Sequence, residues 1–156
     1  MFPTNIVTRC TFYIFHKDLQ TDNVTCEKAI LEGVYWNEDS ATIFSKTGRQ
    51  AKDEALIYVP ADEKTTGRKW IYRDNWAKLP ADKIKNHWTV DIRQAEFTRL
   101  VRGACPFDFT SGTQQHLSQQ MTAFDREFPD AKRPRDVNPQ LLGTPIFHHV
   151  QIQAGR

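Results

Sequence analysis

Two short apolar segments, residues 31–36 (LEGVYW) and 55–60 (ALIYVP), constrain the fold of this chain more than any other feature. Both are rich in branched and aromatic residues, which fit the pleated, half-buried surface of a β-sheet. Each contains a residue that interrupts a sheet, since Gly33 lies within the first segment and Pro60 ends the second. We predict two β-strands, with a bulge at Gly33 that bends the first strand and redirects the side chain of Trp36.

A β-hairpin is predicted before these segments. Residues 9–16 alternate in the manner of a strand with apolar groups on both faces, and residues 24–31 return after the polar stretch 17–23. Further strand signals lie at 88–92, 96–102 and 144–153. The last of these indicates that the chain closes with a strand.

The clearest helix signal is an apolar stripe, which predicts one α-helix over residues 113–128. The stripe recurs at spacings of four, three and four residues and consists of Leu117, Met121, Phe124 and Phe128. Either Ser111 or Thr113 is expected to cap this helix, and Pro129 ends it. The stripe is expected to pack on the sheet.

Two polar stretches, residues 37–54 and 61–86, are predicted as long loops with few core residues. In the second, Asp74 is expected to cap a short helix that runs through Leu79. The whole pattern predicts a mainly β fold: a small β-barrel or sandwich of about six strands, with one packed helix and long loops. We expect a single domain over residues 1–156, whose terminal strands pair with each other or with a neighbouring copy.

The charge balance disfavours a nucleic-acid-binding module. Lys and Arg number 21 against 19 Asp and Glu, which leaves a formal net charge of only +2. Acidic neighbours interrupt both local basic clusters, so we expect the clusters to be solvated surface. The clusters are Arg68, Lys69 and Arg73, and Lys132, Arg133 and Arg135.

The cysteines and apolar runs indicate the compartment. Three widely spaced cysteines do not form a disulfide framework. The first residues lack the features of a secretory signal, and no apolar run approaches the ~20 residues that span a bilayer. We therefore expect a protein made and kept in the cytosol, with no membrane helix.

No catalytic constellation is evident. His148 and His149 are adjacent, and neighbouring side chains on a strand point to opposite faces, so they do not predict a shared metal ion. We expect His148 to be a partly buried core histidine. Cys105 and Ser111 are the strongest nucleophile candidates, but neither lies in a recognisable elbow. The prediction is no catalytic residue, no metal ligand and no cofactor, with the binding residues unknown.

Two alternatives stay open. Four tryptophans could form a stacking platform for single-stranded nucleic acid, or they could anchor the core or an interface, which the near-neutral charge favours. They are Trp36, Trp70, Trp76 and Trp88. The first alternative is therefore a single-stranded nucleic-acid-binding β-barrel that uses tryptophan stacking. The second is a small hydrolase with Cys105 as its nucleophile.

The order of the elements carries a resemblance. The segments concerned are 11–15 (TFYIF), 31–36 (LEGVYW), 57–60 (IYVP), 87–91 (HWTVD), 99–103 (RLVRG) and the closing 143–155. In this order they resemble a family of small minor structural proteins of tailed bacteriophages and prophages. The chain departs from the family pattern at 92–97, which is longer and lacks a Gly-Asp turn, and at 103–135, which is expanded.

The resemblance implies a non-enzymatic head-completion or head-to-tail joining protein, similar to the stopper proteins of the phage neck. It implies a small β-barrel with a long loop, assembled as a homo-oligomeric ring between the portal or connector and the tail proteins. Double-stranded DNA would pass through this ring without specific binding, and no membrane is involved. The implied location is the virion, with assembly in the host cytoplasm. Residues 37–54 and 61–86 are the candidate contact surfaces, and we expect one of them to contact the neighbouring ring or to project towards the DNA channel.

Overall fold

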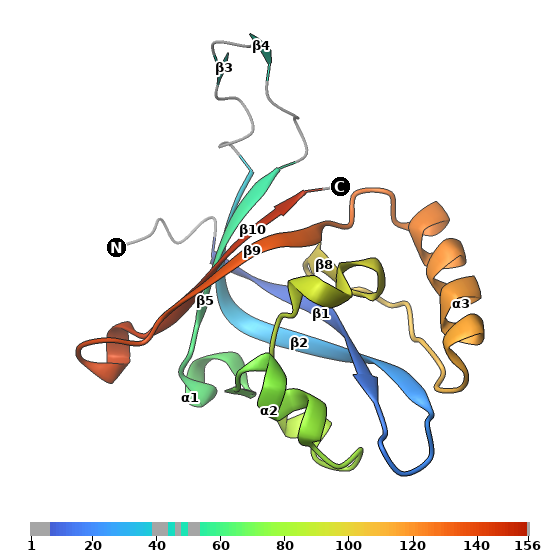
Figure 1. Cartoon of the computed structure of the whole chain (residues 1–156). Helices are drawn as coiled ribbons and strands as arrows, with labels where there is room; N and C mark the ends of the chain where they lie inside the picture. The colour runs from blue at the N-terminus through green and yellow to red at the C-terminus, as the bar shows by residue number, and fades with distance from the viewer. Residues whose placement is uncertain (1–6, 39–43, 46–47, 50–53, 156) are drawn as a thin grey trace.

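A curled six-stranded sheet forms the body of the protein (Figure 1). The computed structural model describes residues 7–38, 44–45, 48–49 and 54–155. The strands are antiparallel in the order β8-β1-β2-β5-β10-β9. Their bounds are β1 (Val7–Lys17), β2 (Val24–Asn37), β5 (Ala55–Pro60), β8 (Arg99–Arg102), β9 (Arg133–Gln140) and β10 (His149–Gly155). The mainly β, half-barrel fold confirms the predicted fold class.

Shorter elements connect these strands. The helices are α1 (Glu63–Thr66), α2 (Arg73–Lys78), α3 (Gln114–Glu127) and the 3₁₀ turns η3 (Ile84–Asn86), η4 (Ile92–Phe97) and η5 (Pro145–Phe147). Two pairs of two-residue strands complete the described elements: β3 (Phe44–Ser45) with β4 (Gly48–Arg49), and β6 (Lys69–Trp70) with β7 (His87–Trp88).

The predicted bulge at Gly33 is confirmed. In the ladder between β1 and β2, Arg9 alone lies opposite two residues, Glu32 and Gly33. Gly33 has φ +73°, a conformation that suits glycine. The extra residue reverses the alternation of β2, so that both Leu31 before it and Trp36 after it are buried in the same inner core.

The inner core receives side chains from every strand of the sheet and from the segment between β5 and β8. Trp76 of α2 and Ile84 of η3 are buried in it, and Trp70 packs against it. The prediction that residues 61–86 form a long loop with few core residues is therefore wrong. This segment folds into short elements because its scattered aromatic residues are buried against the sheet.

The predicted helix is confirmed as α3, which packs on the outer face of the sheet. Its N-cap is Thr113, whose hydroxyl accepts a hydrogen bond from the His116 N–H at 3.1 Å. Phe124 meets Tyr13 of β1 edge-on, with ring centroids 5.1 Å apart. The outer cluster that these residues form is separate from the inner core.

The two edges of the sheet meet at one point. Leu100 of β8 and Lys132, which precedes β9, exchange two backbone hydrogen bonds of 2.8 and 2.9 Å. The sheet therefore curls far enough to bring its first and last strands together. Strand β9 was not predicted, because its sequence RPRDVNPQ is polar and holds two prolines, which a sheet tolerates at an edge.

Four further expectations need correction. Of the two arrangements expected for the terminal strands, pairing with each other does not occur, since β1 lies between β2 and β8 and β10 lies between β5 and β9. Strand β10 begins at His149 rather than at residue 144, because Pro145 starts a 3₁₀ turn. Asp74 is not the cap of α2, which begins after Tyr72 without a side-chain cap. The strand expected over residues 88–92 is reduced to β7.

Candidate interaction surface

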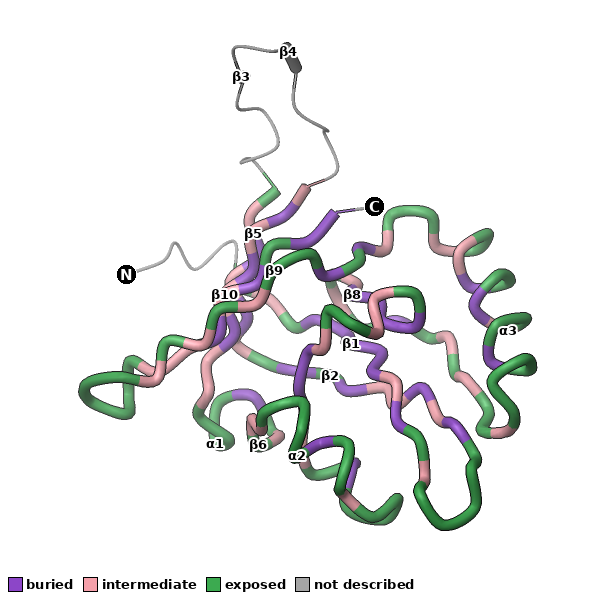
Figure 2. Tube along the Cα trace, in the orientation of Figure 1, coloured by how far each residue is buried: buried purple, intermediate pink, exposed green. Residues whose placement is uncertain are grey.

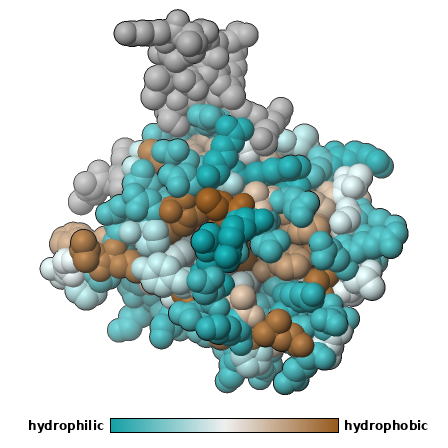
Figure 3. Space-filling view, in the orientation of Figure 1, coloured by the Kyte–Doolittle hydropathy of each residue, from teal (hydrophilic) through white to brown (hydrophobic). Residues whose placement is uncertain are grey.

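The hairpin formed by β9 and β10 ends in an exposed apolar turn. We define the hairpin tip as residues 141–148; Leu142, Ile146 and Phe147 within it are 94, 77 and 75% exposed. No Asp, Glu, Lys or Arg occurs from residue 137 to 155, although these types make up 26% of the chain. Figure 2 shows the exposure of this turn, and Figure 3 shows hydrophobic surface gathered there. Exposed apolar side chains on a charge-free segment are typical of a protein–protein contact.

Local hydrogen bonds hold the tip in this form. Gly143 adopts φ +83°, and the N–H of Phe147 donates to the carbonyl of Thr144 at 3.0 Å. Nε2 of His148 donates to the carbonyl of Gly143, also at 3.0 Å. The turn is thus closed by its own backbone, which leaves its apolar side chains directed to solvent.

An apolar groove of about 360 Å³ lies between the tip and the sheet. Tyr35 and Tyr58 of the sheet have ring centroids 5.5 Å apart, and Tyr58 lies 5.5 Å from the ring of His149. Phe147 of the tip forms part of the same groove. The groove extends the apolar surface of the tip onto the sheet.

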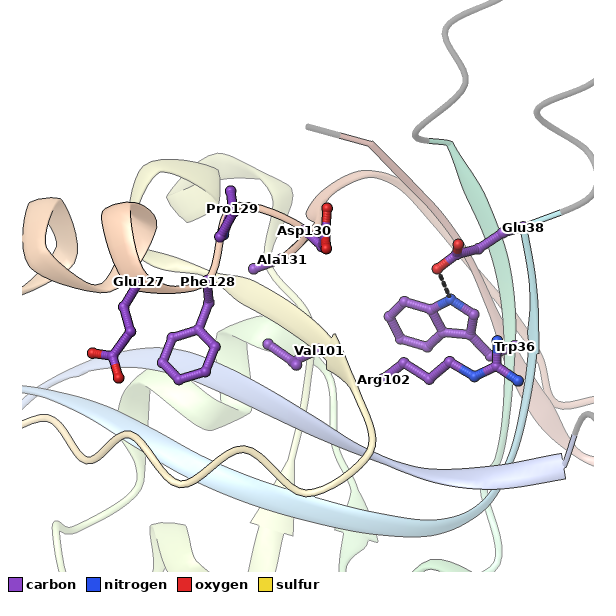
Figure 4. Close-up of a pocket in the computed structure, with 9 residues that line it drawn as sticks. All are labelled: Trp36, Glu38, Val101, Arg102, Glu127, Phe128, Pro129, Asp130 and Ala131. Carbon is purple, nitrogen blue, oxygen red and sulfur yellow. Dashed lines mark hydrogen bonds between the residues drawn. The ribbon is translucent and has the colours of Figure 1, made fainter.

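A second pocket lies where the sheet closes (Figure 4). We name it the Phe128 pocket; its volume is about 280 Å³. Trp36 lies on one side, with its Nε1 donating to Oε1 of Glu38 at 2.8 Å. The other apolar groups are Val101, Phe128, Pro129 and Ala131, and the charged groups are Glu38, Arg102, Glu127 and Asp130.

The hairpin tip and the Phe128 pocket lie at opposite ends of β9. Ala131 of the pocket comes two residues before this strand, and the tip follows its last residue, Gln140. Eight residues of extended chain separate them, which corresponds to about 26 Å at ~3.3 Å per residue. The protein therefore presents a convex apolar surface and a concave surface of mixed polarity at opposite ends of β9.

The histidines are occupied by hydrogen bonds. Each histidine ring bonds to one oxygen: His16 to the Leu79 carbonyl, His87 to the Lys83 carbonyl, His116 to the Thr110 hydroxyl, His148 to the Gly143 carbonyl and His149 to the Phe147 carbonyl. Within the described residues, no three His, Cys, Asp or Glu side chains are placed to hold a metal ion together. His148 is half-buried as expected, but it lies in the hairpin tip and not in the core.

The two nucleophile candidates lie apart from any pocket described above. Cys105 is buried in the outer cluster, and its N–H donates to the hydroxyl of Thr11 at 2.9 Å. Burial, followed by a hydrogen bond to Cys105, raises the pKa of the adjacent Tyr13 hydroxyl. Ser111 is exposed before α3, next to a backbone bridge between Gly112 and Val24.

The expectation that the tryptophans anchor the core is confirmed. Trp36, Trp76 and Trp88 are buried in the inner core. Trp70 is half-buried and packs edge-on against Trp88, with centroids 4.7 Å apart. Their rings are used in packing, which leaves little π surface for stacking on bases.

The basic clusters are not simply solvated. Arg68 is half-buried and forms a 2.8 Å ion pair with Glu27, and Lys132 is buried beside the closure of the sheet. The three remaining arginines also have partners: Arg73 pairs with Asp91, Arg133 with Asp125 and Arg135 with Glu54. Such paired side chains stabilise the fold and do not form a basic groove.

The described residues form a mainly β half-barrel with an exposed apolar hairpin tip. The chain belongs to a family of unknown function, DUF6751, whose model matches residues 5–154. No curated protein and no solved structure matches the chain. No helix in the described ranges is long and apolar enough to cross a membrane. The interface expected in residues 37–54 falls largely outside the described residues.

Proposed function

We propose that this protein is a non-enzymatic structural component of a bacteriophage virion, which forms an oligomeric ring in the neck and joins the head to the tail. The observation that carries the proposal is the placement of two unlike surfaces, the apolar hairpin tip and the partly charged Phe128 pocket, at opposite ends of one strand. Contacts between unlike surfaces of identical subunits generate rings when the rotation closes. The resemblance of the strand order to phage minor structural proteins supports the same function.

The ring would contact the portal or connector on one side and tail proteins on the other. Double-stranded DNA would pass through its centre without specific binding, and the net charge of +2 agrees with a lumen that does not hold phosphates tightly. Assembly would take place in the host cytoplasm, and the final location would be the virion.

The test is to delete the gene from a phage or inducible prophage that encodes it and to examine the particles by electron microscopy. We expect DNA-filled heads and separate tails, with joined particles restored by the gene supplied in trans. Mass spectrometry of wild-type particles should detect the protein. Normal joined particles after deletion, or absence of the protein from purified virions, would overturn the proposal.

A second measurement addresses the nucleic-acid alternative. Fluorescence anisotropy of a labelled single-stranded oligonucleotide is recorded at about 50 and about 200 mM salt. Affinity that depends on phosphate contacts falls steeply between these two salt concentrations. We expect no saturable binding at either salt concentration. Tight binding with a steep salt dependence would favour the nucleic-acid-binding β-barrel over the neck protein.

A further inference from the structure

The hairpin tip exposes apolar surface that the chain itself does not cover. Leu142, Ile146 and Phe147 protrude from one closed turn, and each is at least three-quarters exposed. The backbone hydrogen bonds of the turn hold this shape before any partner arrives. A preformed, convex apolar turn loses little conformational freedom on docking, which favours association.

The Phe128 pocket has the size and lining to receive this turn. Its volume of about 280 Å³ exceeds the ~150 Å³ of an apolar cavity that holds a benzene ring. Trp36, Val101 and Phe128 supply apolar walls. There is room for one or two large side chains such as Leu142 and Ile146.

The charges of the two surfaces are compatible. The pocket carries three carboxylates, from Glu38, Glu127 and Asp130, against the single cation of Arg102. An acidic segment would be repelled there, whereas residues 137–155 contain no carboxylate and have imidazoles as their only titratable side chains. The hairpin tip is thus an apolar segment that brings no carboxylate to this acidic pocket.

We propose that the hairpin tip of one copy docks into the Phe128 pocket of the next copy, so that the protein associates head to tail. The tip and the pocket lie about 26 Å apart along β9, so one copy cannot satisfy its own contact. Each copy then has two neighbours, and the contacts form a ring where the rotation between copies closes. This inference deepens the proposed function, because it rests on the ring and names the contact within it.

The experiment uses two variants that each lose one half of the contact. Leu142→Asp places a charge on the tip and leaves the pocket intact, and Ala131→Arg obstructs the pocket and leaves the tip intact. Pro129→Arg is a second pocket variant, at an exposed position. Leu19→Ser is the matched control, since Leu19 is 72% exposed in the turn between β1 and β2, away from both surfaces. Circular dichroism melts establish that every variant is folded.

Sedimentation velocity is measured from micromolar to several hundred micromolar protein. We expect wild type and Leu19→Ser to exceed the monomer mass of 18.1 kDa with rising concentration. Leu142→Asp and both pocket variants should each associate at least tenfold more weakly. A mixture of Leu142→Asp with Ala131→Arg should give a 1:1 heterodimer, because one intact tip and one intact pocket remain.

Three results would overturn this contact. They are a monomeric wild type at all concentrations, unchanged association of Leu142→Asp, and dimers of both pocket variants, which would indicate symmetrical tip-to-tip pairing. Failure of this contact is distinguishable from failure of the proposed function, which depends on the particles. If the protein is present in the virion and its tip variants still form rings, the proposed function stands and only the proposed contact between tip and pocket is wrong.

Discussion

The guanidinium of Arg99 forms a two-point ion pair with the carboxylate of Asp125, with Nε 2.8 Å from Oδ1 and Nη2 2.9 Å from Oδ2. Arg99 lies in β8 and is 2% exposed, while Asp125 lies in α3. The remaining guanidinium nitrogen, Nη1, donates to the carbonyls of Ala95, Glu96 and Thr98. One side chain thus joins the sheet, η4 and the helix on the outer face.

Arg99→Ala should lower the free energy of unfolding by about 3 kcal/mol, because it leaves a carboxylate and buried carbonyls without their donor. The matched control is Arg133→Ala. Arg133 pairs with the same Asp125 at 3.5 Å but is 47% exposed, so its loss should cost less than about 1 kcal/mol. Urea denaturation followed by circular dichroism measures both. Equal costs for the two variants would contradict the importance of the buried pair.

Gly33→Ala should destabilise the protein more than Gly103→Ala. Both glycines have positive φ, +73° and +87°, so both substitutions carry about 1–2 kcal/mol of backbone strain. Only at Gly33 would the new Cβ meet another atom closely, at 2.7 Å from Cγ2 of Thr65 in α1. The contact adds a packing cost at that site alone.

A double-mutant cycle isolates this contact. Thr65→Ser removes Cγ2 and keeps the hydroxyl that donates to Oδ2 of Asp62. We expect Thr65→Ser to recover part of the loss caused by Gly33→Ala in the double variant and to be nearly neutral alone. Thermal denaturation of the four proteins tests this expectation, and strict additivity would show that α1 does not press on Gly33.

Local patterns predicted the parts of the fold that local chemistry determines. The alternation of β1 and β2, the bulge at Gly33 and the apolar stripe of α3 are encoded within short windows of sequence. Strand β9 is different, because its pairing with β10 stabilises a polar, proline-containing sequence with weak strand preference. An edge position does not require apolar residues on both faces, so little strand signal was present.

The candidate surfaces were harder to predict than the sheet. Alternation over residues 144–153 indicated a strand, but Pro145 and the left-handed Gly143 turn its first part into the exposed tip. The absence of charge from residue 137 onward was the available signal. No sequence signal indicated the Phe128 pocket, because its formation depends on the contact between Leu100 and Lys132. Sequence periodicity does not report contacts between distant segments.

The three cysteines should be unreactive in the folded protein. Cys10, Cys26 and Cys105 are each buried and free in the structure. Burial raises the pKa of the Cys10 and Cys26 thiols, so little of the reactive thiolate is present. Ellman's reagent at pH 8 should label none of the three thiols in buffer and all three in urea. Rapid native labelling of Cys105 would support the hydrolase alternative and contradict the packing.

Trp76→Phe and Trp88→Phe form an informative pair, because both remove an indole from the inner core while only one removes a hydrogen bond. Nε1 of Trp76 donates to the carbonyl of Phe15 at 2.8 Å. Nε1 of Trp88 is buried without a hydrogen-bond partner among the described residues, so its replacement relieves the desolvation penalty of an unpaired donor.

Both substitutions should cost packing energy, and Trp76→Phe should be the more destabilising by about 1–2 kcal/mol. Urea denaturation followed by far-ultraviolet circular dichroism is the suitable measurement, since tryptophan fluorescence itself changes in both variants. A greater loss for Trp88→Phe would mean that its indole N–H has a partner in solution.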